Sequence, residues 1–327
     1  MTRYFLGVDV GGTKTHALIA KENGQACGFG EAGPGNHEGV GYDGLAAAMQ
    51  IATVRAVAQA GISIAHIAGA GFGIGGYDWP SEREPTLRAI QTLGLTAPLD
   101  AVNDTIIGLL AGAAEGWGIA VVAGTGCNCW GWDRDHQRIG RMTGMGWQMG
   151  EAAGAGELVE AALRCIARDW SRRGPSTRLT QAFVEWIGAR DAEDLLEGIT
   201  QARYSLNAEA APLVFQVAAE GDGVARRTIE WAGRELGELA IGVIRQLDFE
   251  ALEFDVVLVG SLYDGGALLT DAMRQTVHAI APGAHFVRLT APPAVGGVLL
   301  GMEQAGLNGR AVRERLIETT KSLPQRN

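Results

Sequence analysis

The chain has 327 residues, of which 47% are hydrophobic and 20% are charged. This length and composition predict a well-packed protein with room for two domains. The 37 acidic and 27 basic side chains give a net charge of −10. This charge argues against a nucleic acid or an anionic membrane surface as partner, because both require a basic patch.

From the sequence we expect neither a targeting segment nor disulfide bonds. The N-terminus has no basic and apolar leader, and no apolar run is long enough to span a bilayer. The four cysteines do not form a disulfide framework. We therefore expect a protein of the reducing cytoplasm.

The first predicted element is an apolar hairpin whose turn carries Gly11, Gly12, Thr13 and Lys14, with Asp9 just before it. The two glycines expose backbone N–H groups and tolerate positive φ, so the turn can cradle a phosphate. The threonine adds a hydroxyl, the lysine a cation, and the aspartate a carboxylate suited to hydrated Mg²⁺. An ordinary hairpin with a glycine-rich turn is the alternative.

The next segments predict a short strand over 27–30, a helix over 43–60 that ends at Gly61, and a buried strand over 64–72. The loop between the short strand and the helix contains Asn36 followed by a histidine. Asparagine can both donate to and accept from a sugar hydroxyl. A turn role is the alternative, given the Gly-Pro-Gly residues that precede it.

A helix over 81–93 and a strand over 99–102 follow, and Asp104 lies where this strand meets a predicted helix over 105–114. A carboxylate at the carboxyl end of a buried strand points into the crevice where α/β proteins bind ligands. It could accept a hydroxyl proton during phosphoryl transfer. Helix capping by Asn103 or Asp104 is the alternative, although a capping Asn103 is compatible with a catalytic Asp104.

A second apolar hairpin begins at Gly118 and turns at Gly124, Thr125 and Gly126. Two glycine-threonine hairpins, each in about half of the chain, suggest two related α/β domains whose turns face each other across a cleft. A third turn, at Gly260 and Ser261, follows another buried strand.

These three turns, in this order, resemble the phosphate-1, phosphate-2 and adenosine motifs of the actin / sugar kinase / heat-shock-70 superfamily. Within it, the chain is similar to the branch that holds N-acetylglucosamine kinases and the BadF/BadG/BcrA/BcrD ATPases. The resemblance runs from Gly7 to about Gly301 and is more specific in the first half. It implies an α/β fold of two ribonuclease-H-like domains with ATP and substrate in the cleft between them, and a homodimer.

The resemblance also implies domain boundaries. The first domain covers residues 1–115, and the second covers 116–309 with a helical insert at about 157–247. A C-terminal helix over 310–322 packs back on the first domain.

The roles of single residues follow from the same resemblance. Asp104 is the catalytic base, Asp9 holds Mg²⁺ through water, and Asn36 contacts the sugar with His37 beside it. A Gly75-Gly76 turn lies under the sugar, where the family often has serine in place of Gly75. The residues expected at ATP are Gly11, Gly12, Thr13, Lys14, Gly124, Thr125, Gly126, Gly260 and Ser261.

One segment departs from the kinases, which carry a Gly-Trp-Gly run followed by Gly-Asp-Glu-Gly-Ser with the aspartate on sugar hydroxyls. Here Glu151 stands at the aspartate position, Ala152 replaces the next glutamate, and the tryptophan is displaced to Trp147. We expect Trp147 and Glu151 to contact the sugar, and the shifted carboxylate suggests a relative of N-acetylglucosamine as substrate, such as glucosamine or another hexose derivative. An acidic residue in the first turn of a helix is the alternative for Glu151.

The expected function is ATP-dependent phosphorylation of a sugar hydroxyl, at C6 of N-acetylglucosamine or a related amino sugar. Two alternatives stay open: an activator ATPase of a radical dehydratase or reductase with an iron–sulfur cluster, and a nucleotide-dependent sensor without catalysis. Cys127 and Cys129 lie on one strand, without an obvious cluster with Cys165, which favours packing over iron binding.

Overall fold

The computed structural model describes residues 2–323 and contains two five-stranded mixed sheets. In the first sheet three strands form an antiparallel meander, and two further strands run parallel to the first strand. Its strand order is β3-β2-β1-β4-β5. The strands are β1 (Tyr4–Val10), β2 (Thr15–Lys21), β3 (Ala26–Ala32), β4 (Ile67–Ile74) and β5 (Leu99–Asn103).

The second sheet repeats this arrangement with the order β10-β9-β6-β7-β8. Again three antiparallel strands are followed by two strands parallel to the first of them. The strands are β6 (Gly118–Ala123), β7 (Cys127–Trp132), β8 (Ile139–Arg141), β9 (Phe254–Val259) and β10 (Ala284–Arg288). The predicted α/β fold of two ribonuclease-H-like domains is confirmed.

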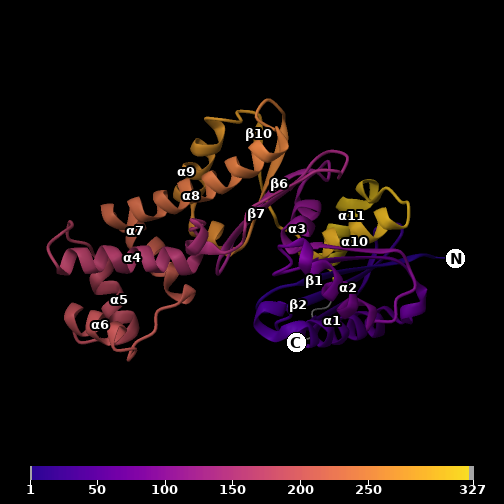
Figure 1. Ribbon diagram of the computed structural model, residues 1–327, viewed down its shortest axis with the longest axis horizontal. Helices are drawn as coiled ribbons and strands as arrows, with labels where there is room; N and C mark the ends of the chain where they lie inside the picture. Colours follow the sequence, from indigo (N-terminus) through magenta and orange to yellow (C-terminus); the bar gives the residue numbers. More distant parts are fainter. Residues whose placement is uncertain (1, 324–327) are drawn as a thin grey trace.

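Helices connect and cover the sheets, and Figure 1 shows them in two lobes, one for each sheet. The first lobe includes α1 (His37–Ala60), α2 (Arg83–Gln91) and α3 (Asp104–Gly112), and the second includes α8 (Gly223–Leu247) and α9 (Ala267–His278). The inserted helices are α4 (Ala155–Trp170), α5 (Leu179–Ile187), α6 (Ala192–Thr200) and α7 (Ala211–Ala219). The last helices are α10 (Ala294–Gln304) and α11 (Arg313–Lys321). Single 3₁₀ turns cover 64–66, 80–82, 146–149, 208–210, 261–265 and 309–312.

The predicted helix over 43–60 begins earlier, at residue 37. Asn36 caps this start, and the helix is interrupted once at Gly41, which has a φ of +68°. Its end is as predicted, since Gly61 adopts the left-handed conformation and its N–H returns to the last turn. Among residues 2–323, no helix is both long and apolar enough to cross a membrane.

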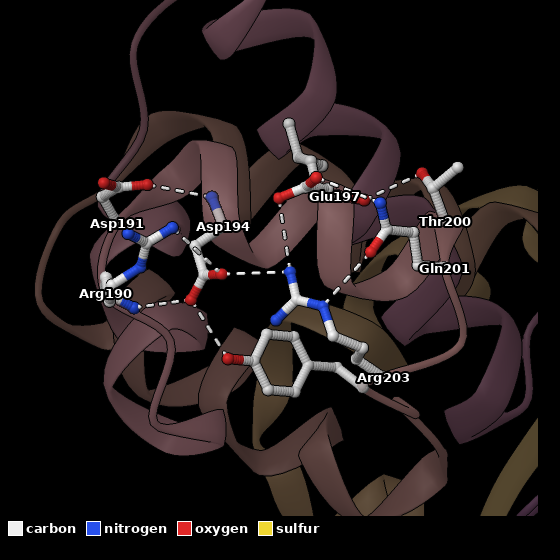
Figure 2. A network of polar contacts seen from close by, with 9 residues as sticks. Arg190, Asp191, Asp194, Glu197, Thr200, Gln201 and Arg203 are labelled. Carbon is white, nitrogen blue, oxygen red and sulfur yellow. Dashed lines mark hydrogen bonds and ion pairs between the residues drawn. The ribbon is translucent and has the colours of Figure 1, made fainter.

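The helical insert contains a charged network around Asp194 of α6 (Figure 2). The Asp194 carboxylate accepts hydrogen bonds from the Arg190 backbone N–H (3.0 Å), the Arg203 guanidinium (3.1 Å) and the Tyr204 hydroxyl (3.1 Å). These bonds, the backbone bond first, hold the pKa of Asp194 well below its usual range against the effect of burial. Asp194 therefore fixes the loops on both sides of α6.

Helix α10 follows the last strand of the second sheet but packs on the first sheet (Figure 1). A Cβ atom at Gly7 of β1 would lie 2.2 Å from the carbonyl oxygen of Ala294, and one at Gly71 of β4 would lie 2.3 Å from that of Gly297. The helix and the strands are thus in backbone contact, which a side chain would prevent. The chain therefore returns to the first lobe before α11, while the boundaries at residues 115 and 309 stay predictions.

Helix α3 contacts the second sheet from the first lobe. A Cβ atom at Gly112 would lie 2.3 Å from the side chain of Val257 in β9, and the Ala114 N–H donates to the Asp255 carboxylate (2.9 Å). The N-terminus of this helix carries Asp104, so packing against β9 and β6 sets where that carboxylate lies between the two domains.

Candidate active site

The predicted phosphate turn after β1 contacts both predicted sugar loops. The Gly11 carbonyl accepts a hydrogen bond from the Gly35 N–H (3.1 Å), and the Val10 carbonyl accepts one from the Gly75 N–H (2.8 Å). The structure therefore brings together three segments that are far apart in the sequence.

Three glycines of the two phosphate turns have open space where a side chain would be, whereas a Cβ atom at Gly11 would lie 3.2 Å from the Lys14 carbonyl oxygen. A Cβ atom at Gly12, Gly124 or Gly126 would meet no atom of residues 2–323 within 4 Å. Gly11 and Gly12 tolerate positive φ, but neither adopts it. The missing side chains instead leave room for a phosphate to approach the backbone N–H groups.

The second phosphate turn is tied to its neighbours in the second domain. The Ala155 N–H at the start of α4 donates to the Gly124 carbonyl (2.8 Å). Gly260 has a φ of +107°, and a Cβ atom there would lie 2.3 Å from the Ala123 carbonyl oxygen. The predicted phosphate and adenosine turns are therefore adjacent. The other residues predicted at ATP are exposed: Thr13, Lys14, Thr125 and Ser261.

Asp104 is the first residue of α3, directly after β5. Asn103 caps this helix, since its side-chain oxygen accepts the Thr105 N–H (2.9 Å). A Cβ atom at Gly75 would lie 3.2 Å from one carboxylate oxygen of Asp104. Burial, and then the charge of Asp78, raise the pKa of Asp104 to about 7. This carboxylate can therefore exchange a proton near neutral pH, as a general base must.

Asp9 of β1 is a second carboxylate at this place. Burial and the charge of Asp104 raise its pKa to about 8. Both effects disfavour the ionised form, and a nearby cation would relieve them. Carboxylate oxygens are ligands that Mg²⁺ prefers, so Asp9 fits the predicted role. Lys14 is paired with Glu31, with Nζ and Oε2 3.3 Å apart.

Asn36 lies against the predicted sugar turn. A Cβ atom at Gly76 would lie 2.4 Å from Asn36 Oδ1, which also accepts the Glu38 N–H (2.9 Å). The His37 ring instead stacks on Tyr42, with the ring centroids 4.5 Å apart. The structure brings Asn36 and Gly76 together and places His37 in packing.

The Glu151 side chain binds the backbone of its own loop, over residues 143–151. Its side chain is buried, and its two oxygens accept the backbone N–H groups of Thr143 (2.7 Å) and Gly144 (2.8 Å). It precedes α4, which begins at Ala155, so it is not a first-turn residue of that helix. Its carboxylate is occupied by its own loop, and a sugar contact there stays a prediction.

Trp147 anchors the same loop to the helices of the second domain. Its ring stacks on Trp231 of α8, with centroids 5.7 Å apart, and the Arg164 guanidinium of α4 lies 4.3 Å from its centroid. The predicted contact of Trp147 with a sugar likewise stays a prediction.

Asp78 and Asn128 were not predicted, yet they join the two domains. Asp78 Oδ1 accepts hydrogen bonds from Asn103 Nδ2 (3.1 Å) and from Asn128 Nδ2 of β7 (3.2 Å). Burial raises the pKa of Asp78 to about 6, against the hydrogen bond from Asn128. One signal could have found Asp78: it follows the buried strand next to the strand that ends at Asp104, and parallel strands end at the same sheet edge.

A cavity of about 450 Å³ between the domains borders this bridge. Among its walls are Trp79 from the first domain and Trp130 and Arg141 from the second. The Arg141 guanidinium lies 4.8 Å from the Trp79 centroid and 5.5 Å from the Trp130 centroid. This cation–π contact adds a second link between the domains.

Cys127 and Cys129 belong to the core of the second domain. Burial raises the pKa of the Cys127 thiol to about 12 and that of the Cys129 thiol well above its usual value. Burial keeps both thiols neutral at neutral pH, as is typical of cysteines that pack in a core. Among residues 2–323, no three His, Cys, Asp or Glu side chains are grouped to hold a metal ion directly.

Two proteins of similar sequence are both named as kinases that act on N-acetylglucosamine. The N-acetyl-D-glucosamine kinase of Dictyostelium discoideum is 25% identical over 311 residues, which cover 91% of this chain and 97% of that protein. The N-acetylmuramic acid/N-acetylglucosamine kinase of Clostridium acetobutylicum is 23% identical over 304 residues, covering 92% of this chain and 99% of that protein.

A solved structure shares the fold. It is a protein from Chromobacterium violaceum, provisionally assigned as an N-acetylglucosamine kinase, with 24% identity and a TM-score of 0.64. The match covers 91% of this chain and 98% of that one. The sequence also matches the model of a protein family over residues 6–301. Because this match spans both domains and all three glycine turns, the chain belongs to the BadF/BadG/BcrA/BcrD ATPase family.

Proposed function

We propose that this protein is a sugar kinase that transfers a phosphoryl group from ATP to a hydroxyl of N-acetylglucosamine or a related amino sugar. The placement of Asp104 carries the proposal: the N-cap of the helix is Asn103, and the Asp104 carboxylate faces the Gly75 turn and has a pKa of about 7. Two relatives named for N-acetylglucosamine phosphorylation support the choice of substrate.

Asp104 accepts the proton of the attacking hydroxyl, which we place at C6 of the sugar. Asn36 and the Gly75-Gly76 turn hold the sugar on the first domain. The loop over 143–151, held in shape by Glu151, lies on the second domain. Closure of the domains excludes water, which otherwise competes as the nucleophile.

The two phosphate turns hold the nucleotide from both sides. A phosphate can approach the backbone at Gly12, Gly124 and Gly126, because a Cβ atom at each would meet no atom of residues 2–323 within 4 Å. The Gly124 N–H itself donates to the Gly126 carbonyl (2.9 Å) and holds the second turn in shape. The turn at Gly260 and Ser261 takes the adenosine. Asp9 would hold hydrated Mg²⁺, which when bound neutralises charge on the phosphates. A homodimer and a cytoplasmic location stay predictions.

The test is release of ADP from Mg·ATP in the presence of single sugars. The panel contains N-acetylglucosamine, glucosamine, N-acetylmannosamine, glucose and N-acetylmuramic acid. We expect strong stimulation by N-acetylglucosamine or a close relative, with one phosphorylated sugar formed per ADP. ATP hydrolysis that no sugar changes would reject the kinase and favour the activator ATPase, and binding of ATP without turnover would favour the sensor.

A further inference from the structure

We propose that Asp78 is a positioning residue of this site. Its carboxylate links the cap of the helix that carries Asp104 to strand β7 of the second domain. The inference rests on the proposed kinase function, in which Asp104 on one domain must face a nucleotide bound largely to the other.

The two amides that meet Asp78 have a defined orientation. Asn103 accepts the Thr105 N–H (2.9 Å) through its side-chain oxygen, and Asn128 accepts the Cys129 N–H (2.8 Å) in the same way. Each amide must therefore turn its NH₂ group away from its own backbone, and both NH₂ groups donate to Asp78 Oδ1. One carboxylate oxygen thus links the start of α3 to β7, two residues after the second phosphate turn.

The carboxylate of Asp78 also lies against the loop that Glu151 holds in shape. A Cβ atom at Gly144 would lie 3.1 Å from Asp78 Oδ2 and 3.2 Å from Oδ1. The next residue, Trp79, contacts Arg141 of β8. Asp78 therefore lies where the cap of α3, strand β7 and the loop over 143–151 meet. Trp79, through Arg141, adds a contact with strand β8.

The carboxylate also acts on Asp104 through its charge. Asp78 is the charged group that raises the pKa of Asp104 beyond the effect of burial. The charges that act on Asp78 itself are those of Glu38, Glu82 and Arg141. Burial first and then the two carboxylates raise its pKa, the guanidinium lowers it, and the resulting pKa is about 6. Asp78 is therefore largely ionised at pH 7.5. In this state it makes Asp104 a stronger base.

Two variants separate the hydrogen bonds from the charge. Asp78→Asn removes the charge but keeps a side-chain oxygen that can accept from both amides. Asp78→Ala removes both the charge and the oxygen that accepts these hydrogen bonds. Asp100→Asn is the matched control, because Asp100 lines the same cavity and pairs with Arg83 (3.3 Å) on the same domain. The readouts are the pH profile of kcat/KM and the titration of the Asp104 carboxyl carbon by NMR in the free protein, with its signal assigned from Asp104→Asn.

We expect Asp78→Asn to lower the pKa of Asp104, and with it the acid limb of the profile, by roughly one pH unit. Its kcat at the alkaline plateau should stay within a few-fold of wild type. Asp78→Ala should show the same shift and in addition lose about tenfold or more in plateau kcat, because the domains are no longer held in register. Asp100→Asn should change neither quantity.

An unchanged Asp104 titration in Asp78→Asn overturns the inference, and so does an Asp78→Ala plateau equal to that of Asp78→Asn. The NMR titration needs no substrate and no turnover. If no sugar is phosphorylated, the proposed function fails while the titration still reports whether Asp78 acts on Asp104.

Discussion

Asp9 lies near the end of β1 and Asp104 directly follows β5, with β4 between these two strands, and the charge of Asp104, after burial, raises the pKa of Asp9 to about 8. Because the pKa of Asp104 is itself about 7, the pair retains protons at neutral pH that two solvated carboxylates would have lost. Burial and the neighbouring carboxylate charge favour a bound proton, and they would equally favour a bound cation. The pH dependence of the free energy of unfolding therefore reports on the site proposed for Mg²⁺.

The free energy of unfolding should fall as the pH rises from about 4 to about 8 through this pair. Both folded pKa values lie above the usual aspartate value of 3.8, so the folded state binds more protons than the unfolded chain over this range and loses that advantage as pH rises. Asp9→Asn should equal wild type near pH 4 and exceed its stability by on the order of 2 kcal/mol near pH 8.

Urea denaturation across this pH range, without Mg²⁺, measures the difference. Asp271→Asn serves as the control, because its carboxylate is exposed. Equal stability of Asp9→Asn and wild type at pH 8 would contradict the raised pKa. Mg²⁺ should then stabilise wild type at pH 8 more than it stabilises Asp9→Asn.

Asp104→Asn should lower turnover by about two to four orders of magnitude, as expected for loss of a general base. Sugar binding, measured by calorimetry, should largely survive because the amide keeps the shape of the carboxylate. Steady-state kinetics with the best sugar gives the comparison. A variant with full activity would remove Asp104 from the mechanism.

Gly12→Ala and Gly126→Ala should bind ATP about tenfold or more weakly while folding normally. The added methyl group meets no protein atom of residues 2–323 and requires no positive φ, so it adds no strain, but it enters the space assigned to phosphate. Gly39→Ala in α1 is the control, since its Cβ also meets nothing within 4 Å of the described chain. Equal KM values for ATP in all three variants would place the nucleotide elsewhere.

Glu151→Gln should raise the KM for sugar more than it lowers kcat. The amide can accept only one of the two backbone hydrogen bonds that the carboxylate accepts, which leaves Thr143 or Gly144 unpaired and loosens the loop. We expect roughly a tenfold rise in KM and about 1–2 kcal/mol less stability. Glu160→Gln, an exposed change on α4, should alter neither value.

Gly296→Ala should destabilise the protein severely. A Cβ atom there would lie 1.8 Å from the Ile107 carbonyl oxygen of α3, so the two helices must move apart. We expect a loss of about 3 kcal/mol or more in guanidinium denaturation. Gly39→Ala should lie within about 1 kcal/mol of wild type in the same assay. Two similar curves would mean that α10 and α3 do not pack this closely.

The sequence predicted the features that depend on near neighbours. The first hairpin, the left-handed Gly61 and the junction at Asp104 follow from local periodicity and from short-range chemistry. The sequence does not distinguish the structural reasons for individual glycines. Gly12 does not have positive φ, and its missing side chain leaves space, whereas Gly260 has both positive φ and a close backbone neighbour.

What the sequence could not predict depends on distant partners. Asp78 binds amides that lie 25 and 50 residues further along the chain, and its place after a buried strand marks the sheet edge but not these two partners. Glu151 matched a family position, but its two bonds depend on how its own loop turns back at Gly144 and Gly150, which both have positive φ.

The contact of α10 with β1 and β4 has a consequence for the order in which the protein is made. The ribosome releases the first sheet early, but the helix that covers one of its faces arrives nearly three hundred residues after Gly7. Until then Phe5 and Leu18 lack the partners that bury them. The domain that is synthesised first is therefore completed last, and the second domain must emerge before the first can finish folding.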